Sequence, residues 1–135
     1  MKELLRFSLL AILFAPFAWA AQNSTLIEKV TASDASGGDH FGSSVSQWGN
    51  FLAVGAKDAD ATYVYRVEDN GSLTELAKLT PPDGGSNSQF GVSVSMTDGI
   101  LAVGAKWSDQ GGHSKSGAAY LYQVEQNGSV LYLDK

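Results

Sequence analysis

The sequence predicts an all-β fold in which a unit of four antiparallel strands occurs twice. Three observations predict it. The chain matches itself over most of its length, each copy holds four short segments rich in β-branched and aromatic residues, and no segment beyond the first twenty residues has the apolar spacing of a helix. Four-stranded units that recur at this spacing are typical of β-propeller blades.

The first twenty residues have the pattern of a signal peptide. Lys2 and Arg6 precede an apolar run, and the segment ends in Ala18-Trp19-Ala20, a small-x-small cleavage site. Pro16 interrupts the uncharged stretch, which is shorter than the roughly 20 apolar residues of a spanning helix. We therefore expect cleavage after Ala20, no membrane span, and a secreted, periplasmic or cell-surface location for residues 21–135.

The rest of the chain consists of two tandem copies of one sequence unit. Phe41-Gly42 recurs 49 residues later as Phe90-Gly91, and the six residues from Leu52 recur unchanged from Leu101. From Tyr63 onward the offset is 57, so the second copy carries eight extra residues, which fall within a Gly/Ser-rich stretch expected to be a loop. The first unit is therefore placed at about 32–80, the second at about 81–135 and the loop at 107–119.

Each unit holds four strand-like segments with turn residues between them. Those of the first unit are 42–47, 51–56, 62–68 and 73–79, and those of the second are 91–96, 100–105, 118–125 and 130 onward. Residues 25–31 precede both units and align with the fourth strand, which makes them a candidate latch strand for closing a ring. Asn-Gly, Gly-Asn and Asp-Gly pairs between strands predict tight hairpins, in which both central residues can have positive φ.

The apolar pattern of these strands predicts how the units are packed. The second strand of each unit is nearly all apolar, as expected for a strand buried on both faces between neighbouring blades. The third strand of the first unit alternates in polarity, which predicts one face more buried than the other. Phe41 and Phe90 are predicted to plug the space between adjacent sheets, and the glycine after each to permit a bend.

Two tandem motifs resemble a known family. Phe41-Gly42 followed by Gly55-Ala56, and Phe90-Gly91 followed by Gly104-Ala105, resemble the FG-GAP repeat, the blade unit of the seven-bladed propeller of integrin α-subunits. The closer likeness is to a bacterial exported subgroup, and it extends from about Leu26 to Lys135. One mild departure is lysine, at positions 57 and 106, where the motif has proline. The resemblance implies that the chain holds two blades of a larger, seven-bladed ring.

The resemblance does not carry a calcium site over to this chain. Integrin-type blades often have a calcium loop of the form D-x-[DN]-x-[DN]-G-x-x-D between their first two strands. Here that connection is 47–50 in one unit and 97–99 in the other, too short to wrap a cation that takes six to eight oxygens. No cofactor is evident, and calcium is expected only in blades outside this chain.

The candidate ligand-binding residues lie in connections between strands: Trp48, Trp107, Asp109 and His113. Trp48 lies in a tight turn and Trp107 opens the inserted loop, so either indole can stack on a sugar or peptide, or instead shield a blade edge. Asp109 and His113 lie within that loop, whose Gly/Ser content serves first of all to turn the chain.

Metal binding and catalysis have little support. Asp58 and Asp60 are the candidates for a metal site, but two carboxylates offer fewer oxygens than a hard cation takes, so a solvated loop is the favoured interpretation. His40 and His113 have no neighbouring pattern of nucleophile and base. We therefore expect no catalytic residue and no enzymatic activity.

The charge of the chain bears on which class of partner it can bind. Nine Lys and Arg against 14 Asp and Glu give a net charge of −5, without any cluster of basic residues. This argues against nucleic acid as a partner, because phosphate contacts need clustered cations. The chain has no cysteine, so no disulfide can staple an incomplete ring.

Two blades leave two apolar faces bare, because a propeller ring has about four to eight blades. In the favoured alternative the chain is an N-terminal fragment of a longer repeat protein, with further blades in cis. In the other, identical chains assemble into a ring. The favoured function is an exported, non-enzymatic scaffold that binds an extracellular protein or carbohydrate, as in cell adhesion. The alternative is an accessory propeller region of an exported hydrolase whose catalytic domain lies beyond the C-terminus.

Overall fold

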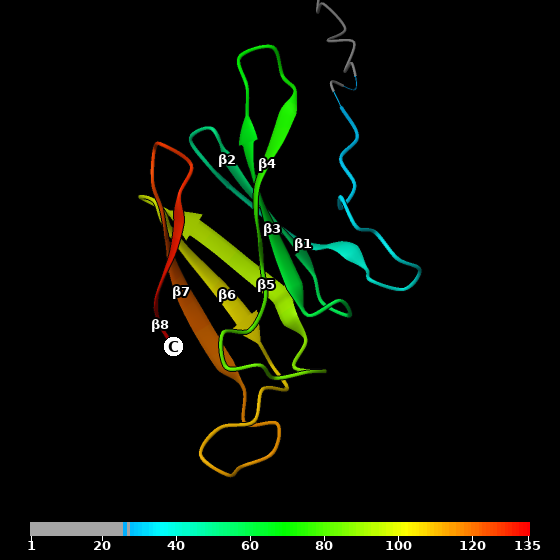
Figure 1. Ribbon diagram of the computed structural model, residues 1–135, viewed down its shortest axis with the longest axis vertical. Helices are drawn as coiled ribbons and strands as arrows, with labels where there is room; N and C mark the ends of the chain where they lie inside the picture. The colour runs from blue at the N-terminus through cyan, green and yellow to red at the C-terminus, as the bar shows by residue number, and fades with distance from the viewer. Residues whose placement is uncertain (1–25, 27) are drawn as a thin grey trace, which may run out of the picture.

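The chain folds as two four-stranded antiparallel sheets, here called blade 1 and blade 2 (Figure 1). The computed structural model describes Leu26 and residues 28–135. Blade 1 contains β1 (Phe41–Trp48), β2 (Phe51–Ala56), β3 (Ala61–Val67) and β4 (Leu73–Leu79), and blade 2 contains β5 (Phe90–Thr97), β6 (Ile100–Ala105), β7 (Ala118–Val124) and β8 (Val130–Asp134). Within each blade the strands lie in sequence order. The predicted all-β fold of two four-stranded blades is confirmed, with strand boundaries within one residue of those expected.

Part of the N-terminal prediction lies beyond what the structure describes. The signal peptide, residues 1–20, is outside the described residues. Of the predicted latch strand, Leu26 and residues 28–31 are described; they form no strand, and Val30 packs against the core of blade 1. A latch needs a partner strand in a further blade, so it stays a prediction. In the described part of the chain, no helix is long and apolar enough to cross a membrane.

The glycine of each Phe-Gly pair forms a β-bulge in the first strand of its blade. Gly42 has a φ of 89° and Gly91 a φ of 86°. The pairing register shifts at the same places, between Phe41 and Ser44 and between Phe90 and Ser93. A side chain is strained at such a φ, which is why glycine stands there. The predicted bend is confirmed.

The predicted hairpins are present, but only one has two central residues with positive φ. That one joins β5 to β6, where Asp98 and Gly99 have φ values of 47° and 76°. In the other three hairpins only the glycine has a positive φ. In the β3–β4 and β7–β8 turns, the asparagine Oδ1 accepts the backbone N–H two residues later, at 2.9 Å for Asn70 and 2.7 Å for Asn127. This side-chain contact supports a longer turn.

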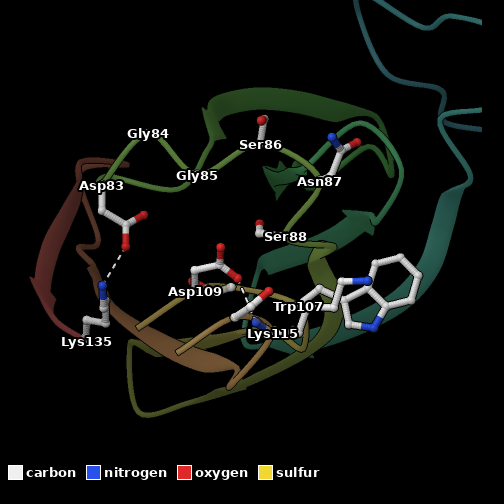
Figure 2. A pocket seen from close by; sticks show the side chains of 12 residues that line it. Asp83, Gly84, Gly85, Ser86, Asn87, Ser88, Trp107, Asp109, Lys115 and Lys135 are labelled. Atoms are coloured by element: carbon white, nitrogen blue, oxygen red, sulfur yellow. Dashed lines mark hydrogen bonds and ion pairs between the residues drawn. The ribbon is translucent and has the colours of Figure 1, made fainter. Parts of the chain in front are cut away.

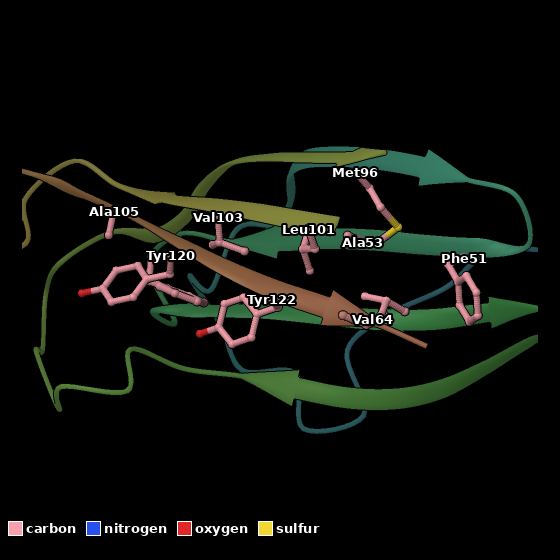
Figure 3. Packing of buried hydrophobic residues seen from close by; sticks show 11 residues of the cluster. Phe51, Ala53, Val64, Met96, Leu101, Val103, Ala105, Tyr120 and Tyr122 are labelled. Carbon is pink, nitrogen blue, oxygen red and sulfur yellow. The ribbon is translucent and has the colours of Figure 1, made fainter. Parts of the chain in front are cut away.

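A hydrophobic core between the blades holds them together (Figure 3). Its buried members are Phe51, Ala53 and Val64 of blade 1 and Phe90, Met96, Leu101, Val103, Ala105, Tyr120, Tyr122 and Val124 of blade 2. The Phe90 ring meets Tyr120 and Tyr122 edge-on, with centroids 5.3 and 6.4 Å apart. Phe90 plugs the space between the sheets as predicted, whereas Phe41 at the same place in blade 1 is only half-buried.

The identical segments in β2 and β6 differ in burial. In β2, residues 53–56 are all buried, whereas in β6 burial alternates and Ala102 and Gly104 are half-exposed. Blade 1 packs against blade 2 on one face and against Val30 and Ala32 on the other, but blade 2 has a neighbour on one face only. The prediction of burial on both faces is therefore confirmed for β2 and wrong for β6, because a strand is buried only where a neighbour covers it.

The third strands show the same effect in reverse. Residues 61–65 of β3 are all buried, so the predicted alternation was wrong for this strand. The equivalent strand β7 does alternate, with Tyr120, Tyr122 and Val124 buried and Ala119 and Leu121 exposed. One sheet face is covered in blade 2 and both faces are covered in blade 1.

The two backbones approach closely at Gly55. The Ser44 Oγ donates to the Gly91 carbonyl at 2.8 Å, and a Cβ on Gly55 would overlap both that carbonyl oxygen and the Ser44 hydroxyl. Nearby, the Ser46 Oγ accepts the Met96 N–H at 2.9 Å. Glycine is needed at position 55 because a backbone from the next blade occupies the space of a side chain.

Candidate functional site

Three connections gather at one end of the blades, opposite the hairpins that join the other strands (Figure 1). They are the β2–β3 turn, the connector 80–89 between the blades, and the β6–β7 loop 106–117. The connector and the loop line a cavity of about 610 Å³, here called the loop pocket. A second hollow of about 120 Å³, which includes Asp58 and Asp60, shares Asn87 and Trp107 with it.

Asp60 fixes one side of the loop pocket. It has a φ of 48°, and its carboxylate accepts the Ser88 hydroxyl at 3.0 Å and the Phe90 N–H at 3.1 Å. These bonds tie the β2–β3 turn of blade 1 to the last residues of the connector. Asp60 is therefore a positioning residue that aligns β5 on blade 1.

A second carboxylate fixes the other side. The Asp83 carboxylate accepts the Tyr120 hydroxyl at 3.0 Å and the Lys135 Nζ at 2.5 Å (Figure 2). The same three residue types meet in blade 1, where Asp34 accepts the Tyr63 hydroxyl at 2.6 Å and the Lys78 Nζ at 2.5 Å. Each unit thus contains an Asp-Tyr-Lys cluster that anchors its preceding connector to the third and fourth strands.

These contacts change the acidity of the groups in both clusters. The lysine hydrogen bond lowers the pKa of Asp34 and of Asp83, and the same bond raises the pKa of Lys78 and of Lys135. Burial is the largest cause at the tyrosines: it raises the pKa of Tyr63, Tyr65 and Tyr120, and that of Tyr122 to about 12. The clusters therefore favour neutral tyrosine, ionised aspartate and charged lysine.

We expect the fold to be lost cooperatively in alkali. A raised folded-state pKa stabilises the protein below the unfolded value and loses that stabilisation as pH rises, here from 10.0, the ordinary tyrosine value, toward 12, the pKa of Tyr122. The lysines act in the same direction. In an alkaline pH titration, tyrosinate absorbance and circular dichroism should therefore change together. The control is the chain in strong denaturant, whose tyrosines should ionise at lower pH. Four tyrosines that ionise near pH 10 with intact strand signal would contradict this expectation.

The predicted ligand residues Trp107 and Asp109 both line the loop pocket. The Trp107 indole is 41% exposed, and the Lys106 and Lys115 Nζ atoms lie 4.9 and 5.1 Å from its ring centroid. The Asp109 carboxylate accepts the Lys115 backbone N–H at 2.6 Å, which closes the β6–β7 loop. Figure 2 places Asp83 and Lys135 at one side of the pocket, Trp107 at the other, and Asp109 between them.

The structure does not bring the other two predicted ligand residues into this pocket. His113 is exposed, and its backbone pairs with Gln110 at the tip of the same loop. Trp48 lies at the opposite end of the strands, half-buried and stacked on Phe51 with centroids 6.3 Å apart. Trp48 therefore contributes to the packing of blade 1 beside the β5–β6 turn, where it approaches Gly99.

The carboxylates of Asp58 and Asp60 are both engaged with protein groups. Asp58 pairs with the Lys57 Nζ at 2.6 Å and with the His40 Nδ1 at 2.5 Å, and the Lys57 hydrogen bond is the largest cause of its lowered pKa. Asp60 holds Ser88 and Phe90, as described above. Among residues 28–135, no three His, Cys, Asp or Glu side chains cluster as a metal site would require.

The fold and the two Phe-Gly bulges identify the family. The sequence pattern of the FG-GAP repeat matches residues 25–73 and again residues 73–122. The chain belongs to the FG-GAP repeat family. The second match begins at β4, one strand before blade 2, and the first begins at residue 25, so residues 25–31 hold the sequence position in the first repeat that β4 holds in the second. No curated protein sequence matches the chain significantly.

The sequence analysis did not identify Asp83 and Lys135 as residues of the loop pocket. The signal was available, since Asp34 aligns with Asp83, Tyr63 with Tyr120 and Lys78 with Lys135. Nothing in the spacing, however, shows that Asp83 in the connector contacts residues 37 and 52 positions further along the chain. The three aligned pairs indicated that aspartate, tyrosine and lysine have the same role in both units. They did not indicate that the three side chains contact one another.

Proposed function

We propose that this chain is part of an exported, non-enzymatic β-propeller scaffold that binds an extracellular protein or carbohydrate at its loop end. The signal-peptide pattern supports export. The observation that carries the binding proposal is the loop pocket, a hollow of about 610 Å³ at the end of a rigid pair of blades. Loops held on a rigid scaffold are where binding residues concentrate.

The chemistry of the pocket suits a polar ligand with one flat apolar face. Trp107 offers an exposed indole, on which the C–H face of a sugar or the side chain of a peptide can stack. Asp83 and Asp109 offer carboxylate acceptors, and Ser86 and Ser114 offer hydroxyl groups. A few convergent polar groups around an aromatic platform are typical of a specific ligand site.

The proposal predicts that Trp107→Ala loses binding. Truncation of a tryptophan that contacts a ligand typically weakens affinity roughly 10- to 30-fold, and the fold should survive because Trp107 belongs to neither hydrophobic core. The probe is an array of glycans and extracellular-matrix proteins, followed by titration of the hits with each variant. Thermal unfolding of Trp107→Ala should match that of the parent chain.

Trp48→Phe is the matched control, because Trp48 lies at the opposite end of the strands and phenylalanine preserves its packing on Phe51. This variant should bind like the parent. Loss of binding in Trp48→Phe with retention in Trp107→Ala would place the ligand at the hairpin end instead. A folded chain that binds nothing on the array would count against the binding function altogether.

A further inference from the structure

Two lysines beside Trp107 have no carboxylate partner. The Lys106 and Lys115 Nζ atoms lie 4.9 and 5.1 Å from the centroid of the indole ring, and both lysines are exposed. Figure 2 shows Lys115 beside Trp107 at one side of the loop pocket. Within residues 28–135, the lysines that form ion pairs are Lys57, Lys78 and Lys135. Two ammonium groups without a counterion therefore meet at one aromatic ring, where an anion is attracted to both.

Comparison of the two repeats shows how this pair of charges arises. Lys106 aligns with Lys57 of blade 1, and Trp107 aligns with Asp58. In blade 1 the Lys57 Nζ pairs with the Asp58 carboxylate at 2.6 Å. In blade 2 an indole stands in place of that carboxylate, and the longer β6–β7 loop brings Lys115 to the same ring. Blade 2 therefore lacks the anion that neutralises the equivalent lysine in blade 1.

The carboxylates of the loop pocket are engaged with other groups. Asp83 accepts the Tyr120 hydroxyl at 3.0 Å and the Lys135 Nζ at 2.5 Å. Asp109 accepts the Lys115 backbone N–H at 2.6 Å, so it contacts the main chain of that lysine. A carboxylate has about four lone-pair sites, which leaves both aspartates able to accept hydroxyl groups of a ligand. The pocket thus combines carboxylate acceptors with two ammonium groups that lack an anion.

We propose that the ligand of the loop pocket is an acidic carbohydrate, whose carboxylate groups pair with Lys106 and Lys115 and whose sugar ring stacks on Trp107. This inference rests on the proposed binding function and names the class of its ligand. A uronate sugar has three features that match the pocket: a carboxylate for the lysines, a C–H face for the indole, and hydroxyl donors for the aspartates. An acidic peptide brings carboxylates that Asp83 and Asp109 repel, without the flat apolar face or the hydroxyl donors.

Oligogalacturonate and hyaluronan oligosaccharides, each with its methyl ester, are the probes. Esterification removes the negative charge and keeps the sugar rings, the linkages and the hydroxyl groups. Isothermal titration calorimetry with the full chain from an exporting host should show binding of an acid form and roughly 20-fold weaker binding of its ester, about fivefold for each lysine pair. Binding of the acid should weaken as salt concentration rises, because exposed charges are screened.

The lysine variants test the site itself. Lys106→Gln and Lys115→Gln should each weaken binding of the acid about fivefold and leave binding of the ester unchanged. Lys57→Gln is the matched control, because it removes the same charge beside the smaller hollow that shares Trp107, where Asp58 already pairs with the lysine. This variant should bind the acid like the parent. Thermal unfolding of all three variants should match that of the parent.

Four outcomes would overturn the acidic-carbohydrate proposal. They are equal affinity for acid and ester, an equal loss in Lys57→Gln, tighter binding of a glutamate-rich peptide than of either oligosaccharide, and binding of neither acid. The glycan and protein array separates this failure from failure of the binding function. A neutral ligand whose binding needs Trp107 would leave the proposed function standing with a different ligand class, whereas a folded chain that binds nothing would contradict both.

Discussion

Phe90→Ala is expected to lower the free energy of unfolding by about 3–5 kcal/mol, the usual cost of truncating a buried phenylalanine. The Phe90 side chain is fully buried and lies edge-on to Tyr120 and Tyr122 in the core between the blades. Its removal leaves a cavity that joins two sheets, so the change should both destabilise the chain and loosen the blades. Urea unfolding followed by circular dichroism measures the loss.

The repeat supplies the control for this experiment. Phe41 occupies the same position in blade 1 and touches Tyr63 and Tyr65 in the same way, but it is only half-buried. Phe41→Ala should therefore lower the free energy of unfolding clearly less than Phe90→Ala does. Equal losses of unfolding free energy in the two variants would mean that Phe90, in the core between the blades, contributes no more to stability than the half-buried Phe41 of blade 1.

Gly55→Ala is expected to destabilise the chain by about 1–3 kcal/mol, the range for overpacking a well-packed core. The added methyl group would overlap the Gly91 carbonyl oxygen, which is backbone of the neighbouring blade and moves only if β5 moves. The change should also break the hydrogen bond from the Ser44 hydroxyl to that carbonyl. Chemical unfolding gives the loss, and hydrogen exchange at Met96 N–H reports whether the blades separate.

Gly104→Ala is the matched variant in an identical sequence context. The nearest atoms to its added methyl group all belong to Ser93, whose hydroxyl can rotate away. Gly104→Ala should therefore change the free energy of unfolding little. An effect as large as that of Gly55→Ala would show that crowding within one blade, rather than the neighbouring backbone, demands glycine in this strand.

Local features of this protein were predictable because they depend on nearby residues. Segments rich in β-branched and aromatic residues, bounded by turn residues, placed all eight strands, since both signals are carried by neighbouring residues. The bulges at Gly42 and Gly91 followed from glycine's tolerance of positive φ. The inserted loop was recognised from its composition, and Trp107 and Asp109 within it line the loop pocket.

Contacts between distant segments could not be predicted in this way. Asp83 reaches Tyr120 and Lys135 because the connector folds back across blade 2, and the loop pocket exists because that connector meets the β6–β7 loop. Trp48 and Trp107 looked alike as tryptophans in connections, but they lie at opposite ends of the strands. The number of residues between two positions in the sequence therefore did not indicate how far apart they lie in the fold.

By itself the sequence determined the unit: four strands, their order, their turns and the bulge that begins each blade. Only the tertiary structure decided what each copy of that unit buries. Residues 52–57 and 101–106 are identical, yet one segment is enclosed and the other has an open face. The physical reason is that residue types close together in the chain mark the strands and turns, whereas burial depends on which neighbouring surface covers a strand.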